Sequence, residues 1–265
     1  MQPLIIIATP NICWLNPDVD YPRTPESIAE EANLCYENGA TILHTHGAGD
    51  NPSSSHWAEV IQAVRARCEI IVQCGMSSLP IPDRMDVYKN KADMISIILN
   101  HHDEVFARTE CLVLHPRQEL EEYARLCRQY KVVPEFEVWH AGSIWNLNYL
   151  IGKKLLKLPY VNTLFFGWPG GTWSPATVDE YLYRRRMMPD GSVCNISIMG
   201  NGQREIITTA ILMGDHVRVG TEDYPYNHAG KLITTHELVK ETAEIAKALG
   251  RPLANITQAR QMIGL

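Results

Sequence analysis

The chain has 265 residues, an apolar content of 45% and a formal net charge of −6, which suit a folded protein with a sizeable core. Charged residues are mixed along the chain, so the composition gives no support to a nucleic-acid-binding surface. The N-terminus has no basic region followed by an apolar stretch, and no apolar run approaches the roughly 20 residues of a membrane span. Neither a signal peptide nor a membrane anchor is therefore expected.

The seven cysteines are scattered, odd in number and without CxxC spacing. This usage is typical of free thiols in a reducing compartment rather than of a disulfide framework. We therefore expect a cytoplasmic protein.

Short apolar runs alternate with amphipathic stretches along nearly the whole chain. The predicted strands cover residues 4–9, 41–46, 70–74, 94–98, 132–139, 163–167, 194–199 and 216–220. The predicted helices cover residues 27–38, 58–67, 118–130, 144–156, 177–186, 204–213 and 231–249. The first helix has a clear start signal, because Thr24 can cap it and Pro25 suits its first position.

Strands that alternate with helices favour a parallel sheet, and eight such units in about 250 residues predict a single-domain (β/α)8 barrel. An open doubly wound sheet is the alternative, but no Gly-x-Gly-x-x-Gly follows the first strand. Residues 100–115 are expected to form an elaborated loop. A terminal helix over 256–264 is expected to pack on the outside of the barrel.

The segment Leu43-His44-Thr45-His46-Gly47 carries two histidines at the end of a predicted strand. Alternate residues of a strand point to the same side, so the two imidazoles leave one face together. Such a pair is either a metal clamp, most often for zinc, or a hydrogen-bonded core pair.

A second segment, residues 216–223, ends the eighth predicted strand with Arg218, Glu222 and Asp223. Closure of a barrel makes its first and last strands neighbours, so this strand end meets the end of the second strand, at the face where barrel enzymes keep their active sites. His44, His46 and Glu222 then form a three-ligand site with an open position for substrate. Arg218 and Asp223 are either catalytic or an ion pair at the rim.

Three other features are candidates for the site. Glu137 ends the fifth predicted strand, where an unpartnered carboxylate would be costly, so it is expected to face the barrel mouth, while Glu135 is expected to be solvated. His140 is a weaker metal candidate. Gly170 and Gly171 after the sixth strand permit close approach to a ligand or simply form a tight turn, and the loop at 200–203 opens a helix whose N–H groups suit a phosphate.

Several motifs together resemble the β-keto acid cleavage enzymes, the family that acts on substrates such as 3-keto-5-aminohexanoate, and mark the chain as a divergent member. The matching pieces occur in family order over nearly the whole chain: residues 24–26, 38–46, 133–137, 167–171, 216–223 and 249–254. The resemblance implies a zinc-bearing barrel that cleaves a β-keto acid with acetyl-CoA and gives acetoacetate and a new acyl-CoA. It also implies a homo-oligomer, dimeric or tetrameric.

The same resemblance implies roles for particular residues. His44, His46 and Glu222 would bind one zinc ion, Arg218 and Asp223 would be the catalytic pair, and Glu137 would be a further site residue. The metal would stabilise charge on the keto oxygen while Asp223 takes the proton that starts carbon–carbon cleavage.

The chain departs from the family pattern in the loops that hold substrate. Where the pattern has Thr-Gly-Ala-Glu after the first strand, this chain has Asn-Ile-Cys-Trp, so Trp14 replaces a carboxylate. After the third strand Ser-Thr-Gly-Gly becomes Gly75-Met-Ser77-Ser, and Ser96 stands where a Thr is expected. We predict that Trp14 and these positions bind substrate, and that a neutral or apolar acyl tail is preferred over a cationic one.

Two other functions stay open on the sequence. One is a CoA-independent, metal-dependent carbon–carbon lyase or hydrolase on the same scaffold. The other is a non-catalytic, metal-containing small-molecule binder, which the presence of Arg218 and Asp223 beside the metal ligands disfavours.

Overall fold

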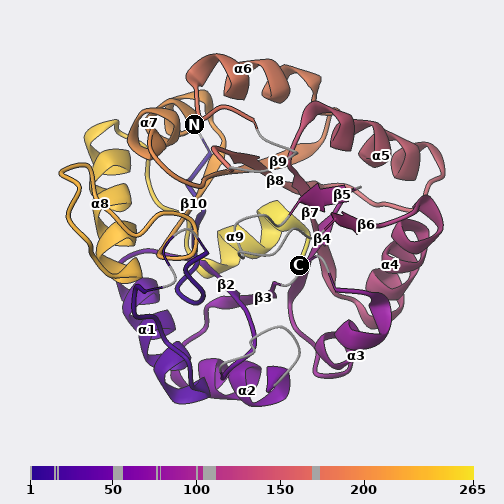
Figure 1. Cartoon of the computed structure of the whole chain (residues 1–265), viewed down its shortest axis with the longest axis horizontal. Coiled ribbons are helices and arrows are strands. Elements are labelled where there is room, and N and C mark those ends of the chain that lie inside the picture. Colours follow the sequence, from indigo (N-terminus) through magenta and orange to yellow (C-terminus); the bar gives the residue numbers. More distant parts are fainter. Residues whose placement is uncertain are drawn as a thin grey trace.

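The computed structural model describes residues 2–14, 16, 18–49, 56–75, 77, 79–99, 115–168 and 174–265, and the backbone of residues 101–103 and 112–114. Within that part of the chain, eight parallel strands close a barrel in the order β1-β10-β9-β8-β7-β4-β3-β2. Helices surround the barrel on its outer wall (Figure 1). The predicted (β/α)8 barrel is confirmed, and the alternative of an open sheet is wrong.

The barrel strands alternate along the chain with the surrounding helices. The strands are β1 (Ile6–Ala8), β2 (Ile42–Thr45), β3 (Ile71–Cys74), β4 (Met94–Ile98), β7 (Val133–Val138), β8 (Tyr160–Phe166), β9 (Ser192–Ile198) and β10 (His216–Val219). The helices are α1 (Pro25–Glu37), α2 (Trp57–Arg67), α3 (Ile81–Lys89), α4 (Arg117–Tyr130), α5 (Ala141–Gly152), α6 (Val178–Met187), α7 (Gln203–Met213), α8 (Thr235–Ala248) and α9 (Ile256–Ile263).

Every predicted strand and helix has a counterpart in the structure, with bounds that differ by up to four residues. Helix α3 was not predicted, because it has only nine residues and begins among prolines, which are more typical of turns. Helix α5 begins at Ala141, with His140 as its N-cap, rather than at residue 144. Helix α1 begins where expected, because Thr24 and Ser27 form a capping box and Pro25 occupies the first turn.

Residues 101–103 and 112–114 form a separate antiparallel pair, β5 (His101–Asp103) and β6 (Leu112–Leu114), within the segment expected to be an elaborated loop. The pair is hydrogen-bonded apart from the barrel and follows β4 directly in the chain. Among the described residues, no helix has both the length and the apolar character needed to cross a membrane.

The lower half of the barrel interior is apolar and is closed by the C-terminal helix. Inward side chains from several strands pack with residues of and before α9 in one cluster, namely Ile5, Ile7, Ile42, Ile71, Met94, Val161, Ala254, Ala259 and Ile263. Helix α9 accordingly lies across the centre of the barrel in the view down its axis (Figure 1). The expectation that this helix packs on the outside is wrong, because its apolar face covers the open N-terminal ends of the strands.

Two buried arginines fix the upper strand ends from the helical layer. Arg84 of α3 donates to the carbonyl oxygens of Gly75 and Ser96, after β3 and in β4. Arg184 of α6 donates in the same way to the carbonyl oxygens of Val138 and Phe165. Each guanidinium bridges two neighbouring strands, so the strand ends that carry the site are held at a fixed spacing.

Candidate metal centre and active site

His44 on β2 and His46 directly after this strand lie side by side, and both face the barrel interior. Their exposed fractions are 2% and 3%, and their ring centroids are 5.2 Å apart. The spacing of two residues predicted this common direction. Leu43 lies on the other face of the strand and packs in the large apolar core, and the Thr45 hydroxyl donates to Asn11. The two rings therefore present nitrogen atoms to the same space.

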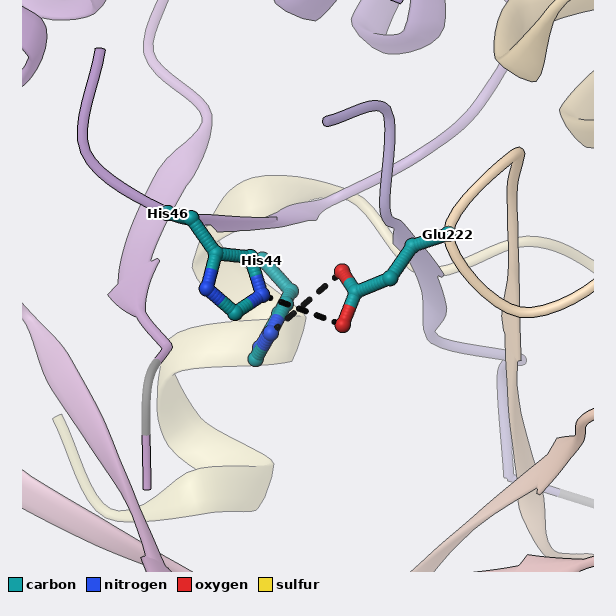
Figure 2. Close-up of side chains that lie close together, drawn as sticks. All are labelled: His44, His46 and Glu222. Atoms are coloured by element: carbon teal, nitrogen blue, oxygen red, sulfur yellow. Dashed lines mark hydrogen bonds and ion pairs between the residues drawn. The ribbon is translucent and has the colours of Figure 1, made fainter. Parts of the chain in front are cut away.

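Glu222 reaches that space from the turn that follows β10 (Figure 2). Its Oε1 lies 3.1 Å from Nε2 of His46, and its Oε2 lies 3.6 Å from Nε2 of His44. Ligand atoms of the three residues all lie within 4.8 Å of one another. Donor atoms about 2.0–2.2 Å from one tetrahedral zinc ion are separated by about 3.3–3.5 Å, so the two nitrogens and the carboxylate suit such an ion.

Closure of the barrel brings Glu222 to the histidines. Strand β10 pairs with β1, and β1 pairs with β2 on its other side. Gly220 then lets the chain cross the end of β1, because a Cβ atom at this position would clash with the backbone of Thr9. The N–H of Glu222 donates to the carbonyl oxygen of Thr9 at 3.2 Å, which sets the start of the turn.

Gly75, at the end of β3, leaves room between the two imidazoles. A Cβ atom at Gly75 would lie 2.7 Å from Nε2 of His44 and 3.0 Å from Nε2 of His46. A side chain would thus occupy the space that faces both ligand nitrogens. Gly75 was predicted as a substrate-binding residue, and the structure places it beside the predicted metal ligands.

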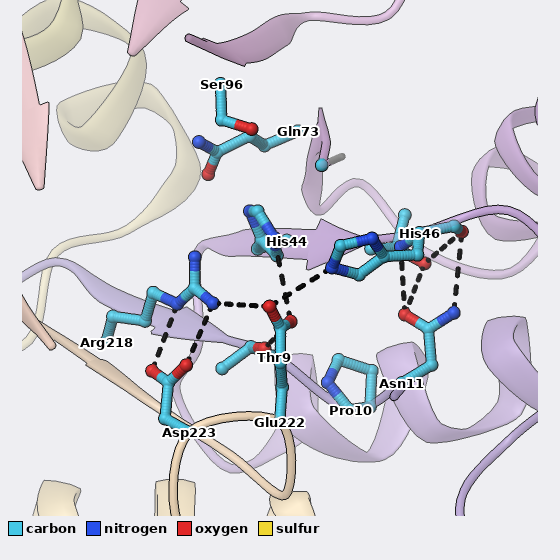
Figure 3. Close-up of polar contacts among 12 residues, drawn as sticks. Thr9, Pro10, Asn11, His44, His46, Gln73, Ser96, Arg218, Glu222 and Asp223 are labelled. Carbon is cyan, nitrogen blue, oxygen red and sulfur yellow. Dashed lines mark hydrogen bonds and ion pairs between the residues drawn. The ribbon is translucent and has the colours of Figure 1, made fainter. Parts of the chain in front are cut away.

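Arg218 on β10 joins the two carboxylates of the turn. Its Nη2 atom donates to Oδ1 of Asp223 and to Oε1 of Glu222, both at 2.8 Å, and its Nε donates to Oδ2 of Asp223 at 3.0 Å. Ser197 on β9 donates a further hydrogen bond of 2.8 Å to Asp223. Arg218, Glu222 and Asp223 are all buried. Figure 3 shows the guanidinium bonded to both carboxylates, so Arg218 and Asp223 are not an exposed ion pair at the rim.

Burial and charge set the protonation of these groups. Burial opposes ionisation of Glu222, but Arg218 and the two histidines outweigh it and hold the pKa of Glu222 well below its usual range. Burial, followed by the charge of Arg218, lowers the pKa of His44 to about 4, so this imidazole is neutral and free to bind a metal at neutral pH. Burial raises the pKa of Asp223 to about 6, with Arg218 opposing the shift and Glu222 adding to it.

Residues after β1 support the predicted metal ligands. Thr9 donates a short hydrogen bond from its hydroxyl to Oε2 of Glu222. Asn11 accepts from the backbone N–H of His46 at 3.0 Å and donates to the carbonyl oxygens of His46 and Gly47. Figure 3 shows Thr9 next to Glu222 and Asn11 next to the backbone of His46. Sequence reasoning missed both residues, because a lone Thr or Asn in a loop carries no spacing signal.

Trp14, predicted to bind substrate, lies next to two of the predicted ligands. Its Nε1 donates to Oε1 of Glu222 at 3.4 Å, and its ring meets His46 edge to face at a centroid distance of 5.7 Å. The rest of the half-buried indole packs on an apolar cluster at the top of the barrel, formed by Ile98, Trp139, Phe165, Trp168 and Met199. Trp14 thus lies between the ligands and this cluster, in a position to shape the space for substrate.

Glu137 on β7 is buried at the edge of the same cluster. Its Oε2 accepts from Nε1 of Trp139 at 2.9 Å, and Trp139 stacks on Phe165 at a centroid distance of 4.1 Å. The carboxylate also helps to raise the pKa of Arg218, after the larger contributions of burial, which opposes the rise, and of Asp223 and Glu222. His140 lies elsewhere, with Nδ1 accepting from Gly142 as the cap of α5.

The remaining predicted substrate residues have different outcomes. Ser77 is buried just after Gly75. Ser96 is buried on β4, and its hydroxyl donates to the carbonyl oxygen of Cys74 at 3.3 Å, so it ties two strands together. Gly170 and Gly171 lie outside the described residues.

Glu135 and Gln73 form a buried pair that the sequence analysis did not identify. Glu135 has no exposed surface, so the expectation of a solvated side chain is wrong. Gln73 donates from Nε2 to Oε2 of Glu135 at 2.7 Å. Burial is the main cause that raises the pKa of Glu135 to about 8, with the charge of Glu137 next. The period of two along β7 carried the signal, because Glu135 must share the inward face of Glu137.

Known proteins resemble this chain along nearly its whole length. Residues 3–265 match the family described as beta-keto acid cleavage enzyme. The chain is 30% identical over 285 residues to a 3-keto-5-aminohexanoate cleavage enzyme of Fusobacterium nucleatum, covering 100% of this chain and 99% of the relative. It is 26% identical over 266 residues to a 3-oxoadipate:acetyl-CoA acetyltransferase of Cupriavidus necator, covering 93% and 89%.

Solved structures share the fold at lower identity. The apo structure of ObcA superposes with a TM-score of 0.74 at 18% identity, over 92% of this chain and 65% of that one. This chain thus spans slightly less than two thirds of that larger protein. Because the family match covers nearly every residue and includes the strands that carry the histidines, Arg218 and the two carboxylates, the chain belongs to the β-keto acid cleavage enzyme family.

Proposed function

We propose that the protein is a zinc-dependent enzyme that cleaves a β-keto acid with acetyl-CoA and releases acetoacetate and an acyl-CoA. The proposal rests mainly on one observation: the Arg218–Asp223 pair is hydrogen-bonded to the group of His44, His46 and Glu222 inside one barrel mouth. The acetyl-CoA-dependent relative of Cupriavidus necator supports the choice of co-substrate.

Each of these residues has a chemical task in this reaction. His44, His46 and Glu222 would hold the zinc ion, which when bound supplies a Lewis acid for the keto oxygen of the substrate. Asp223 accepts the proton whose removal starts carbon–carbon cleavage, and its pKa of about 6 leaves it ionised yet basic at neutral pH. Arg218 and Ser197 orient its two oxygen atoms.

The surroundings of Trp14 support a neutral or apolar acyl tail. Trp14 stands where the family pattern has a carboxylate, and its neighbours Ile98, Phe165 and Met199 are apolar. Glu137 is already hydrogen-bonded to Trp139. An ammonium group would gain a cation–π contact of about 0.5–2 kcal/mol, which is weaker than a charge-assisted hydrogen bond of matched geometry.

A screen of β-keto acids with acetyl-CoA tests this function. We expect acetoacetate to form from a keto acid with a neutral tail, with strict dependence on the CoA ester. Best turnover of 3-keto-5-aminohexanoate would contradict the role given to Trp14. Substrate loss without any CoA ester would instead favour the CoA-independent lyase or hydrolase.

The metal assignment has its own test. His44→Ala should lose most of the bound zinc on metal analysis, because three protein ligands leave little redundancy. An unchanged zinc content in that variant would contradict the assignment of His44, His46 and Glu222.

We also propose that the protein works as a homo-oligomer in the cytoplasm. The six described cysteines are all free, which supports a reducing compartment. Leu212 and Met213 are adjacent at the end of α7 and 52% and 43% exposed, and this apolar pair supports an interface between copies. Light scattering of the purified protein distinguishes a dimer or tetramer from a monomer.

A further inference from the structure

The histidine nitrogens that face away from Glu222 are buried and have no hydrogen-bond partner among the residues that the structure describes. Nε2 of His44 faces Glu222 at 3.6 Å, so Nδ1 is the atom that keeps its hydrogen when Nε2 binds a metal. Nδ1 of His44 is one of the buried atoms without a partner. A metal-bound histidine nearly always donates this second N–H to an acceptor that fixes the ring, so an acceptor is required here.

Gln73 offers an unused acceptor on the neighbouring strand. It is the parallel pairing partner of His44, and both side chains face the barrel interior. Its Oε1 atom is buried, and no group in the described part of the chain hydrogen-bonds to it. Figure 3 shows the Gln73 amide on the side of His44 opposite Glu222.

Glu135 determines which end of the Gln73 amide faces His44. Nε2 of Gln73 donates to Oε2 of Glu135 at 2.7 Å. Because the donor and acceptor of an amide lie on opposite sides of its carbon, this bond turns Oε1 away from Glu135. Glu135 has no exposed surface and no place in the reaction described above, so holding the amide gives this buried carboxyl group a function.

From these contacts we propose that Gln73 is a positioning residue for the metal ligand His44, held in place by Glu135. Oε1 of Gln73 accepts the Nδ1–H of His44 in the metal-bound protein, after a small rotation about the soft terminal torsion of the glutamine. The resulting chain runs from Glu135 through Gln73 to His44 and fixes the ring so that Nε2 faces the metal. The proposal rests on the metal centre of the proposed function.

Zinc affinity, measured by competition with a chromogenic chelator, tests the proposal without any enzymatic reaction. Gln73→Met keeps the length of the side chain but removes the strong acceptor, and should weaken zinc binding about 10–100-fold. Gln73→Glu keeps an acceptor toward His44. Glu135, whose pKa burial raises to about 8, can donate its own proton to the other oxygen of the new carboxylate, so this variant should bind zinc within about 3-fold of the parent protein. Thr41→Val removes a buried hydroxyl just before β2 that makes no hydrogen bond to Glu135, Gln73 or His44 among the described residues, and should leave affinity unchanged.

The outcomes separate this proposal from the metal assignment. Parent-like zinc affinity in a folded Gln73→Met protein, or weak binding in Gln73→Glu equal to that of Gln73→Met, overturns the role of Gln73. If His44→Ala also keeps its zinc, the metal centre itself is wrong.

Should Gln73→Met fail to fold, NMR of the zinc-loaded parent protein with 15N-labelled histidine decides the question. A hydrogen-bonded Nδ1–H of His44 that exchanges slowly and changes its shift in Gln73→Glu supports the proposal. A rapidly exchanging Nδ1–H, or a shift unaffected by Gln73→Glu, overturns it.

Discussion

At the scale of single residues, the space between His44 and His46 depends on Gly75. Gly75 is not among the glycines with a positive φ, so a side chain at this residue would not strain the backbone. The constraint on Gly75 is therefore steric and local, because the added atom would lie 2.7 Å from a ligand nitrogen.

Gly75→Ala should consequently lose bound zinc while the barrel stays folded. The methyl group would displace the imidazole of His44 or occupy the place of the ion. Metal analysis and circular dichroism check both parts of the expectation. Gly152→Ala is the matched control, because nothing lies within 4 Å of a Cβ atom there, and it should keep its zinc. Equal zinc in the two variants would show that the ligand set tolerates a side chain at residue 75.

Asp223→Asn should keep the metal but lose at least about a hundredfold in turnover, the usual scale for a lost general base. The amide retains the shape of the side chain and an acceptor for Arg218, but it cannot take up a proton. Zinc content and turnover measured on the same preparation separate the two effects. Near-normal turnover would mean that Asp223 only holds Arg218 in place.

The direction of the histidine pair was predictable from residue spacing, whereas the buried polar pair beneath it, Gln73 and Glu135, was not. His44 and His46 stand out because two metal-ligand residues at a spacing of two are uncommon. Glu135 and Gln73 obey the same alternation, but nothing in one sequence says that a polar side chain on an inward face lies above the apolar layer rather than in it. That depends on the stagger of the strands, which only the closed barrel defines.

At the scale of elements, the contact between β1 and β10 places Glu222 beside the histidines. The lower end of this seam includes His216, whose Nδ1 accepts from the backbone N–H of Ile5 at 3.0 Å. Burial, followed by the charge of Arg251, lowers the pKa of His216 to about 3. His216 can accept this hydrogen bond only while its ring is neutral, so protonation of the ring at low pH would break the bond.

This seam should make the protein less stable as the pH falls below about 6.5. The unfolded chain binds a proton at His216 near pH 6.5, while the folded chain does not until about pH 3, so the unfolded state binds more protons in between. At pH 4.5 the cost is about 3 kcal/mol. Urea unfolding at pH 7 and pH 4.5, both in chelator, should show a smaller loss of stability for His216→Gln, which keeps an acceptor but does not titrate. Parallel pH dependences for the two proteins would rule out His216 as the cause.

Element boundaries were predictable where a local signal marks them. Thr24 and Pro25 identify the start of α1 because capping and the fixed φ of proline act within one turn. The start of β8 at Tyr160 rather than residue 163 depends on pairing with β9, which begins at Ser192. Pairing across the barrel is a long-range effect, so the sequence of either strand alone does not define it.

At the scale of the whole molecule, the interior is divided into an apolar lower part and a polar upper part, with α9 closing the lower end. The amphipathic pattern of α9 indicates a helix that covers an apolar surface, but not which one. The outer wall and the bottom of the barrel are both apolar, so only the three-dimensional arrangement distinguishes them.

A charge on the inner face of α9 should therefore destabilise the entire barrel. Ala259→Asp puts a carboxylate against Ile5 and Ile7 and should lower the free energy of unfolding by about 3–5 kcal/mol. Gln261→Asp changes an exposed residue of the same helix and should shift it by less than about 0.5 kcal/mol. Chemical denaturation of the two variants gives the comparison, and similar values would mean that α9 is not part of the core.

Because α9 closes one end of the barrel, the space inside is a cavity with a closed bottom. The keto acid, the thioester and both products must then use the opposite end, where the histidines and Trp14 lie. With one entrance for both substrates, we expect the small keto acid to bind before the larger CoA ester, and the new acyl-CoA to leave before acetoacetate.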